Sequence, residues 1–247
     1  MDIDKRLEEA KNRIIGTQRE RLGIGTLGEK TVHATLKHYY EPNEDYHEVP
    51  VEGYVADIYK DGNIVEIQTA QFHRMREKLK AFLPKYKVTV VYPIVGKRQL
   101  YWIDPQSGEI TPGRSTKKIN PYRIFPELYR IKSFLQEENL NIRVVVLDVD
   151  EYKLLDGWGE KKKNHASKYD RVPNRIVGEY VIERREDYMQ FMPVEPEITF
   201  TAKEFAKIVK CTGEEAGIAM NILHEMGMVD RIGKQGNAFV YQVKEIM

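Results

Sequence analysis

The residues best placed to do chemistry are two carboxylates, Asp57 and Glu66, in the segment VADIYKDGNIVEIQTAQF. Asp61-Gly62 separates two short runs that are typical of strands, which predicts a tight hairpin turn. Pairing outward from that turn places Asp57 opposite Glu66 on one face, with Cβ atoms about 5 Å apart. Like charges so placed are destabilising unless a cation cancels them, and Mg²⁺ or Mn²⁺ takes oxygen ligands of this kind. The alternative is an exposed acidic pair on a solvated hairpin.

Gln68 follows Glu66 by two residues, so the alternation of a strand puts its side chain on the same face. An amide can align a water but cannot supply positive charge. Lys78 or Arg74, in the helix expected next, could reach back as a cationic substitute. His33 and His73 are expected to be surface or packing residues, and Asp148 with Asp150 is a second acidic pair at the end of an apolar strand.

Helices and strands alternate around these residues, which predicts an α/β domain with a mixed central sheet flanked by helices. The expected helices span residues 2–22, 26–40, 70–82 and 126–138, and the expected strands, besides the hairpin, span 87–95, 100–113 and 141–155.

A helix with an acid, an Asp-bearing strand, a Glu-x-x strand, a helix and a buried strand, in that order, resemble the core of the PD-(D/E)XK nuclease superfamily, which is restriction-endonuclease-like in fold. The resemblance covers about residues 26–95. It implies that Asp57, Glu66 and the carbonyl of Ile67 hold Mg²⁺ or Mn²⁺. It also implies that Glu29 matches the helix acid and that the chain is a metal-dependent endonuclease acting on DNA.

Two features depart from the family pattern. Gln68 stands where the family usually has lysine, and no proline precedes Asp57. Glu29 also has a second explanation, because Thr26-x-x-Glu29 has the spacing of a helix capping box. Two alternatives therefore stay open: a catalytically inactive protein that binds nucleic acid, and a transcription regulator whose large domain senses a ligand.

The remaining chain predicts a basic linker and connecting strand at 156–190 and a separate module at 191–247. Residues 1–25 and 26–155 are expected to form an N-terminal helix and the nuclease-like domain. Two short helices followed by a hairpin resemble a winged helix-turn-helix. Its second helix begins with acidic residues, so phosphate contacts are expected from the hairpin and from basic runs elsewhere. The expected nucleic-acid contacts are Arg74, Arg76, Lys161, Lys162, Lys163, Arg231 and Lys234.

Composition sets outer bounds on these hypotheses. The net charge is +1, so binding to nucleic acid, most simply double-stranded DNA, must come from local patches. The single cysteine, Cys211, excludes an internal disulfide and a cysteine-based zinc site. No apolar stretch predicts a signal peptide or a membrane span, so a cytoplasmic location is expected. The narrow apolar stripe of the first helix suits a neighbouring element or a homodimer.

Overall fold

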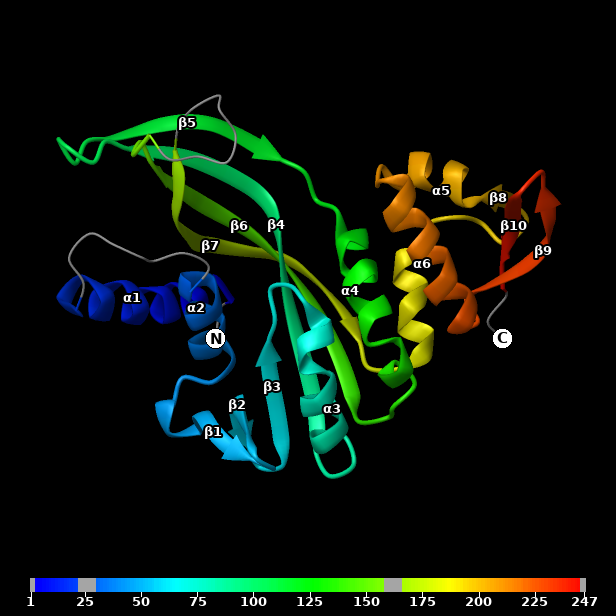
Figure 1. The fold of residues 1–247 in the computed structure, drawn as a ribbon, viewed down its shortest axis with the longest axis horizontal. Helices are drawn as coiled ribbons and strands as arrows, with labels where there is room; N and C mark the ends of the chain where they lie inside the picture. Colours follow the sequence, from blue (N-terminus) through cyan, green and yellow to red (C-terminus); the bar gives the residue numbers. More distant parts are fainter. Residues whose placement is uncertain (1–2, 22–29, 158–165, 245–247) are drawn as a thin grey trace.

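The computed structural model describes residues 3–21, 30–157 and 166–244 (Figure 1). Its larger part is a mixed sheet of seven strands with helices on both faces, which confirms the expected α/β class. The strands are β1 (His47–Val51), β2 (Tyr54–Lys60), β3 (Asn63–Ile67), β4 (Lys87–Ile103), β5 (Ile110–Lys117), β6 (Leu140–Leu154) and β7 (Ser167–Ile182). The helices of this part are α1 (Ile3–Arg21), α2 (Lys30–Tyr40), α3 (Arg76–Phe82) and α4 (Phe125–Arg130), with 3-10 turns η1 (Glu44–Tyr46), η2 (Phe72–Met75), η3 (Pro121–Ile124) and η4 (Lys132–Phe134).

The strand order is β1-β2-β3-β4-β6-β7, with β5 paired to β4. The first three strands form an antiparallel meander, and β3, β4 and β6 run parallel. Parallel neighbours need a crossover connection, and η2 with α3 supplies it between β3 and β4. This crossover places α3 directly beside the strand that carries Glu66.

Two apolar layers cover the sheet. On one face, α1 and α2 bury Leu7 and Leu36 against Ile67 and other side chains of that face. On the other face, α3 and α4 pack against Ile64 and the alternate residues of β4 and β6. Because side chains alternate along a strand, neighbouring residues of β3 serve different layers. Ile64 and Ile67 show this division, and α2 and α3 therefore lie on opposite faces.

The predicted hairpin is confirmed. Asp61 and Gly62 have φ values of 49° and 77°, the left-handed conformations that a two-residue turn of this kind requires. The ladder pairs Lys60 with Asn63, Tyr59 with Ile64 and Ile58 with Val65, as the sequence predicts. Ile58 and Val65 form the last pair between β2 and β3, so this ladder ends before Asp57 and Glu66, while β2 stays paired with β1 along its other edge.

Several boundaries differ from the sequence-based expectation. The helix expected at 126–138 ends at Arg130 and continues only as a 3-10 turn, and the helix expected at 70–82 begins as one. The connecting strand is longer than expected, because β7 begins at Ser167, within the expected basic linker, and pairs with β6 along its whole length. Neither β1 nor β8 (Thr199–Thr201) was expected. Among the described residues, no helix is long and apolar enough to cross a membrane.

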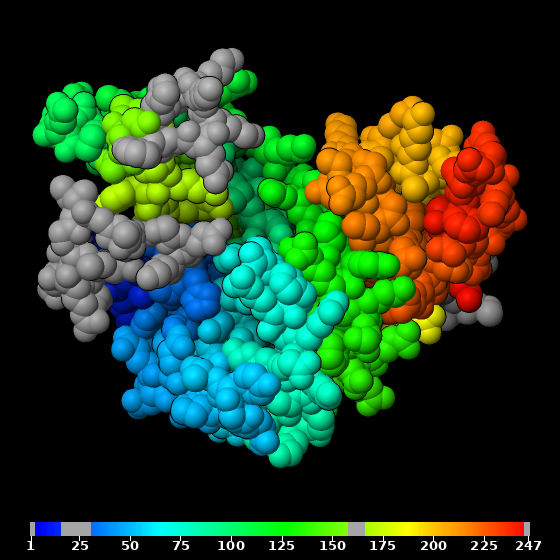
Figure 2. Space-filling model, viewed as in Figure 1, coloured from blue at the N-terminus to red at the C-terminus, as the bar shows by residue number. Residues whose placement is uncertain are grey.

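After η5 (Arg185–Phe191), the C-terminal module forms a separate lobe, orange to red in Figure 2. It contains β8, α5 (Ala202–Val209), α6 (Gly213–Glu225), β9 (Val229–Gln235) and β10 (Ala238–Val243), with the three strands in the order β8-β10-β9. The module is tied to the main domain by a shared apolar core and by α6, which packs on α4. Tyr122 marks the junction, since its hydroxyl donates to the Phe191 carbonyl and its ring contacts Phe205.

Candidate active site

Asp57 and Glu66 meet where β2 separates from β3. The Asp57 backbone N–H donates to Glu66 Oε1 at 3.4 Å, and the Ile67 N–H donates to Asp57 Oδ2 at 2.8 Å. The Asp57 carboxylate thus takes the Ile67 donor at the point where the strand ladder has ended. The two carboxylates are neighbours, as expected, but they are joined through backbone groups at a strand fork rather than as a simple pair on one face.

Each carboxylate receives a partner from a different helical layer. Lys78 Nζ on α3 donates to Glu66 Oε2 at 2.6 Å. His33 Nε2 on α2 lies 3.1 Å from Asp57 Oδ2. The expectation that one face of the sheet supplies all polar groups was therefore wrong. Both helical layers supply contacts to the acids, because Lys78 reaches Glu66 from α3 and His33 reaches Asp57 from α2.

Burial and charge make the Glu66 carboxyl harder to ionise than the Asp57 carboxyl. Glu66 is 4% exposed. Burial, and then the charge of Asp57, raise the pKa of the Glu66 carboxyl to about 7 despite the opposing Lys78. For Asp57, burial pushes the pKa upward, but the hydrogen bond and charge of His33, the Ile67 N–H and Lys78 outweigh it and leave the pKa below its usual value. At neutral pH Asp57 is therefore ionised, whereas Glu66 is close to half protonated.

This donor set fits a hard divalent cation. Mg²⁺ is commonly held by one or two carboxylates, with waters and substrate phosphate completing the octahedron, and the adjacent Asp57 and Glu66 can supply such ligands. The described residues contain no group of three or more His, Cys, Asp or Glu side chains that could hold a metal ion. Glu29, the acid expected from the preceding helix, lies outside the described residues.

The other side chains expected at the site are placed less favourably. Gln68 is half-buried, and its amide donates to the Ala70 carbonyl rather than reaching the acids. Arg76 is exposed and its Nε donates to the Arg130 carbonyl at 2.5 Å, towards α4. Arg74 is exposed and lies one turn before Lys78. Of the lysines and arginines expected at the site, Lys78 alone contacts either acid among the described residues.

The more distant candidates do not converge on the acids. Lys161, Lys162 and Lys163 lie outside the described residues. Arg231 and Lys234 are on β9, where both cations lie over the ring of Phe239, at 4.4 Å and 5.1 Å from its centroid. All three side chains are exposed. They form a separate basic and aromatic surface on the C-terminal hairpin.

A small cavity of about 70 Å³ lies against β4 and β6. Its walls include Val32, the neighbour of His33, and Thr69, three residues after Glu66. Arg171 of β7 also lines it. A larger cavity of about 410 Å³ lies elsewhere, between the start of β6 and the C-terminal module, lined among others by Arg185 and Tyr188.

Sequence reasoning missed His33 and Arg171. For His33 a signal was present, because it follows Glu29 by four residues and so shares a helix face with an acid that was expected at the site. For Arg171 no local signal existed. It reaches the small cavity only because β7 returns antiparallel beside β6, a pairing of residues distant in sequence.

The comparisons with known proteins concern both parts of the chain. No solved structure matches it. A protein of Treponema pallidum (strain Nichols), described as an uncharacterized protein, is 27% identical over 221 residues, covering 89% of this chain and 87% of that protein. A family model described as a domain of unknown function, DUF8091, matches residues 30–183, from the start of α2 to just past the end of β7. That match covers more than half of the chain, which therefore belongs to the DUF8091 family.

Proposed function

We propose that this protein is a metal-dependent phosphodiesterase, an endonuclease that acts on DNA. The observation that carries the proposal is the convergence of Asp57, Glu66 and Lys78 at the fork between β2 and β3. Two carboxylates and a lysine of this kind are the groups that the PD-(D/E)XK resemblance requires. The order of elements from α2 through the hairpin and α3 to the parallel strand β4 also agrees with that resemblance.

Asp57 and Glu66 would hold Mg²⁺ or Mn²⁺. When bound, such an ion polarises a phosphate oxygen and lowers the pKa of a water that can attack phosphorus. Ile67 already uses its N–H to orient Asp57. His33 fixes the same carboxylate from the opposite side, so the metal-binding oxygens are positioned before any ion arrives.

Lys78 takes the role that Gln68 cannot fill. In the family pattern the lysine follows the second acid by two residues on the same strand, and here Gln68 occupies that position. Lys78 reaches Glu66 from α3 and brings a positive charge to the same carboxylate. Its ammonium group would offset the negative charge that grows on the phosphate during displacement.

The C-terminal module would add affinity through its hairpin. On α6 the exposed residues are Gly213, Glu214, Gly217 and Glu225, and the other α6 residues are buried or half-buried. A helix so covered, with acids at its exposed positions, is poorly suited to the major groove. Arg231 and Lys234 beside Phe239 offer the exposed positive charge that phosphate binding requires.

Supercoiled plasmid DNA incubated with Mn²⁺ or Mg²⁺ tests the proposal. The wild-type protein is expected to nick the plasmid, and Asp57→Asn and Glu66→Gln are each expected to lower the rate at least a hundredfold. Asp61→Asn is the matched control, because it changes an acid of the same hairpin in an exposed turn and should leave the rate unchanged. Metal-independent cleavage, or equal activity in all variants, would show that these acids are not the catalytic groups.

The tethering of the Gln68 amide to Ala70 favours one alternative, a protein that binds nucleic acid without cutting it. The same assay separates the two functions. Plasmid that is shifted on a gel but stays intact at every metal concentration would support the binding protein. Parallel incubations with RNA and single-stranded DNA identify the nucleic acid.

A further inference from the structure

A second buried glutamate, Glu151 of β6, lies on the same sheet and is 3% exposed. Arg171 on β7 directly opposes it and donates to Oε2 at 2.7 Å. Arg98 on β4 donates to Oε1 at 3.3 Å, and Lys153, two residues further along β6, lies 3.9 Å away. The strand pairing thus gathers these cations around one buried carboxylate.

This cluster has more positive charge than a buried glutamate needs. Burial raises the pKa of the Glu151 carboxyl, but Arg171, Arg98 and Lys153 outweigh that effect and hold the pKa below its usual value. Asp170 lies beside Arg171, and its carboxylate accepts a hydrogen bond from Thr31. Even with Asp170 counted, the positive charges outnumber the negative ones.

The hydrogen-bonding capacity of the arginines is also incompletely used. The Nε atoms of Arg98 and Arg171 are buried and have no hydrogen-bond partner among the described residues. Their side chains are nevertheless 38% and 31% exposed, so part of each guanidinium faces solvent. A guanidinium presents a planar fork of donors that matches phosphate oxygens. The cluster therefore offers positive charge at a partly exposed surface, although the two Nε donors themselves are buried.

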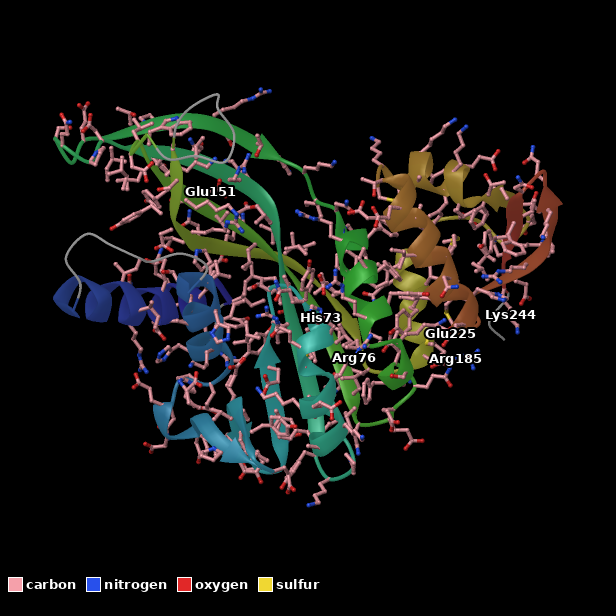
Figure 3. The ribbon with its side chains drawn as sticks, in the orientation of Figure 1. His73, Arg76, Glu151, Arg185, Glu225 and Lys244 are labelled. Carbon is pink, nitrogen blue, oxygen red and sulfur yellow. The ribbon has the colours of Figure 1, made fainter. Side chains whose placement is uncertain are left out.

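Arg171 connects this cluster with residues that flank the candidate active site. It lines the cavity whose other walls include Thr69, which follows β3, and Val32, which precedes His33. Its neighbour Asp170 accepts a hydrogen bond from Thr31, at the start of α2. In Figure 3, Glu151 lies in the upper part of the sheet near β5.

We propose that Arg98, Lys153 and Arg171 form a subsite that binds backbone phosphates of a polynucleotide next to the Asp57 and Glu66 carboxylates. This inference rests on the proposed function for the identity of the ligand. Glu151 is a positioning residue, because its buried carboxylate orients both arginines before the ligand binds. One arginine would suffice to neutralise a buried glutamate, so a purely structural role does not require all three cations.

Binding measured without metal tests the subsite independently of cleavage. Fluorescence anisotropy with a 5′-fluorescein-labelled 30-nucleotide DNA, single-stranded or as a duplex, is recorded in EDTA from 50 to 200 mM salt. Arg171→Gln is expected to weaken binding about tenfold and to reduce the slope of log affinity against log salt by about one. Lys153→Gln should weaken binding about threefold. Lys87→Gln, an exposed lysine at the other end of β4, is the control and should bind like the wild type.

Glu151 is left buried when Arg171 is removed, so thermal melting must accompany each variant. If Arg171→Gln does not fold, Lys153→Gln decides, because Lys153 is the most distant of the three cations from Glu151. Folded variants with unchanged affinity and slope would overturn the subsite, as would a wild-type protein that binds neither DNA.

The two proposals can fail separately. Asp57→Asn with Glu66→Gln should abolish cutting while DNA binding in EDTA is retained. Binding that depends on Arg171 in a protein that never cuts would leave the subsite standing and remove the nuclease. Cleavage by a protein whose binding ignores Arg171 and Lys153 would do the reverse.

Discussion

Glu66 and Glu151 are buried almost equally, at 4% and 3% exposure, on neighbouring parts of one sheet, yet their pKa values shift in opposite directions. Burial raises the pKa of both carboxyls. Glu66 has an acid and one lysine beside it, whereas Glu151 has two arginines and a lysine. The comparison shows that neighbouring charges can reverse the direction in which burial alone would shift a carboxyl pKa.

The two clusters are complementary in what they lack. The cluster around Glu66 has two adjacent carboxylates and suits a cation, and the cluster around Glu151 has excess positive charge and suits an anion. A metal ion together with a nucleic-acid phosphate would satisfy both. This complementarity is the physical link between the proposed chemistry and the proposed binding subsite.

The largest expected effect separates the two glutamates by their contribution to stability. Glu151→Ala removes the only carboxylate that the two arginines share and should lower the free energy of unfolding by about 3 kcal/mol. This is the low end for a broken buried ion pair, because Arg98 and Arg171 are partly exposed. Glu66→Gln should stabilise the metal-free protein by about 1 kcal/mol at pH 8, since it relieves repulsion with Asp57. Urea unfolding of both variants measures the difference, and equal losses would break the comparison.

The pH dependence of the metal-free protein should carry the signature of Glu66. Its pKa of about 7 in the folded state lies above the ordinary 4.5, so the folded protein binds more protons between these values. Stability should therefore fall as pH rises from 4.5 to 7, by at most about 3 kcal/mol, and level off above 7. Urea unfolding in EDTA across this range measures the fall, and Glu66→Gln should remove it. An identical pH profile in the two proteins would contradict the assignment.

Lys78→Met should then raise the pKa of Glu66 further, because it removes the cation that favours the charged form. The cleavage rate is expected to fall tenfold to a hundredfold, which corresponds to about 1.4–2.7 kcal/mol in the barrier. Lys80→Met, an exposed lysine on the same helix, provides the control. A Lys78→Met variant as active as the wild type would show that another residue supplies the positive charge at the site.

The sequence predicted the hairpin and its register because Asp61-Gly62 encodes the turn locally. It placed Asp57 and Glu66 side by side for the same reason. It could not predict that the β2–β3 ladder ends before Asp57, because no residue of the hairpin marks where the two strands stop pairing. The choice of Lys78 over Gln68 likewise depended on how α3 packs on the sheet.

The basic linker and connecting strand expected at 156–190 were divided at the wrong residue for a related reason. Residues 167–175 are polar and basic over much of their length, which is typical of a solvated segment. They form the first part of the edge strand β7, and only the pairing with β6 identifies them as strand. That same pairing creates the Glu151 and Arg171 contact, so the error in the linker also concealed the second cluster.

The smallest expected effect lies on the C-terminal hairpin. It contrasts cations that a buried acid orients with cations on an exposed surface. Arg231 and Lys234 lie over the ring of Phe239 on an exposed surface, with no buried acid to orient them. Replacing either cation with glutamine should therefore weaken DNA binding only about threefold, less than Arg171→Gln, although the charge removed is the same. Anisotropy at 50 mM salt measures both losses. A larger loss at the hairpin would mean that the C-terminal module, and not the sheet, holds most of the nucleic acid.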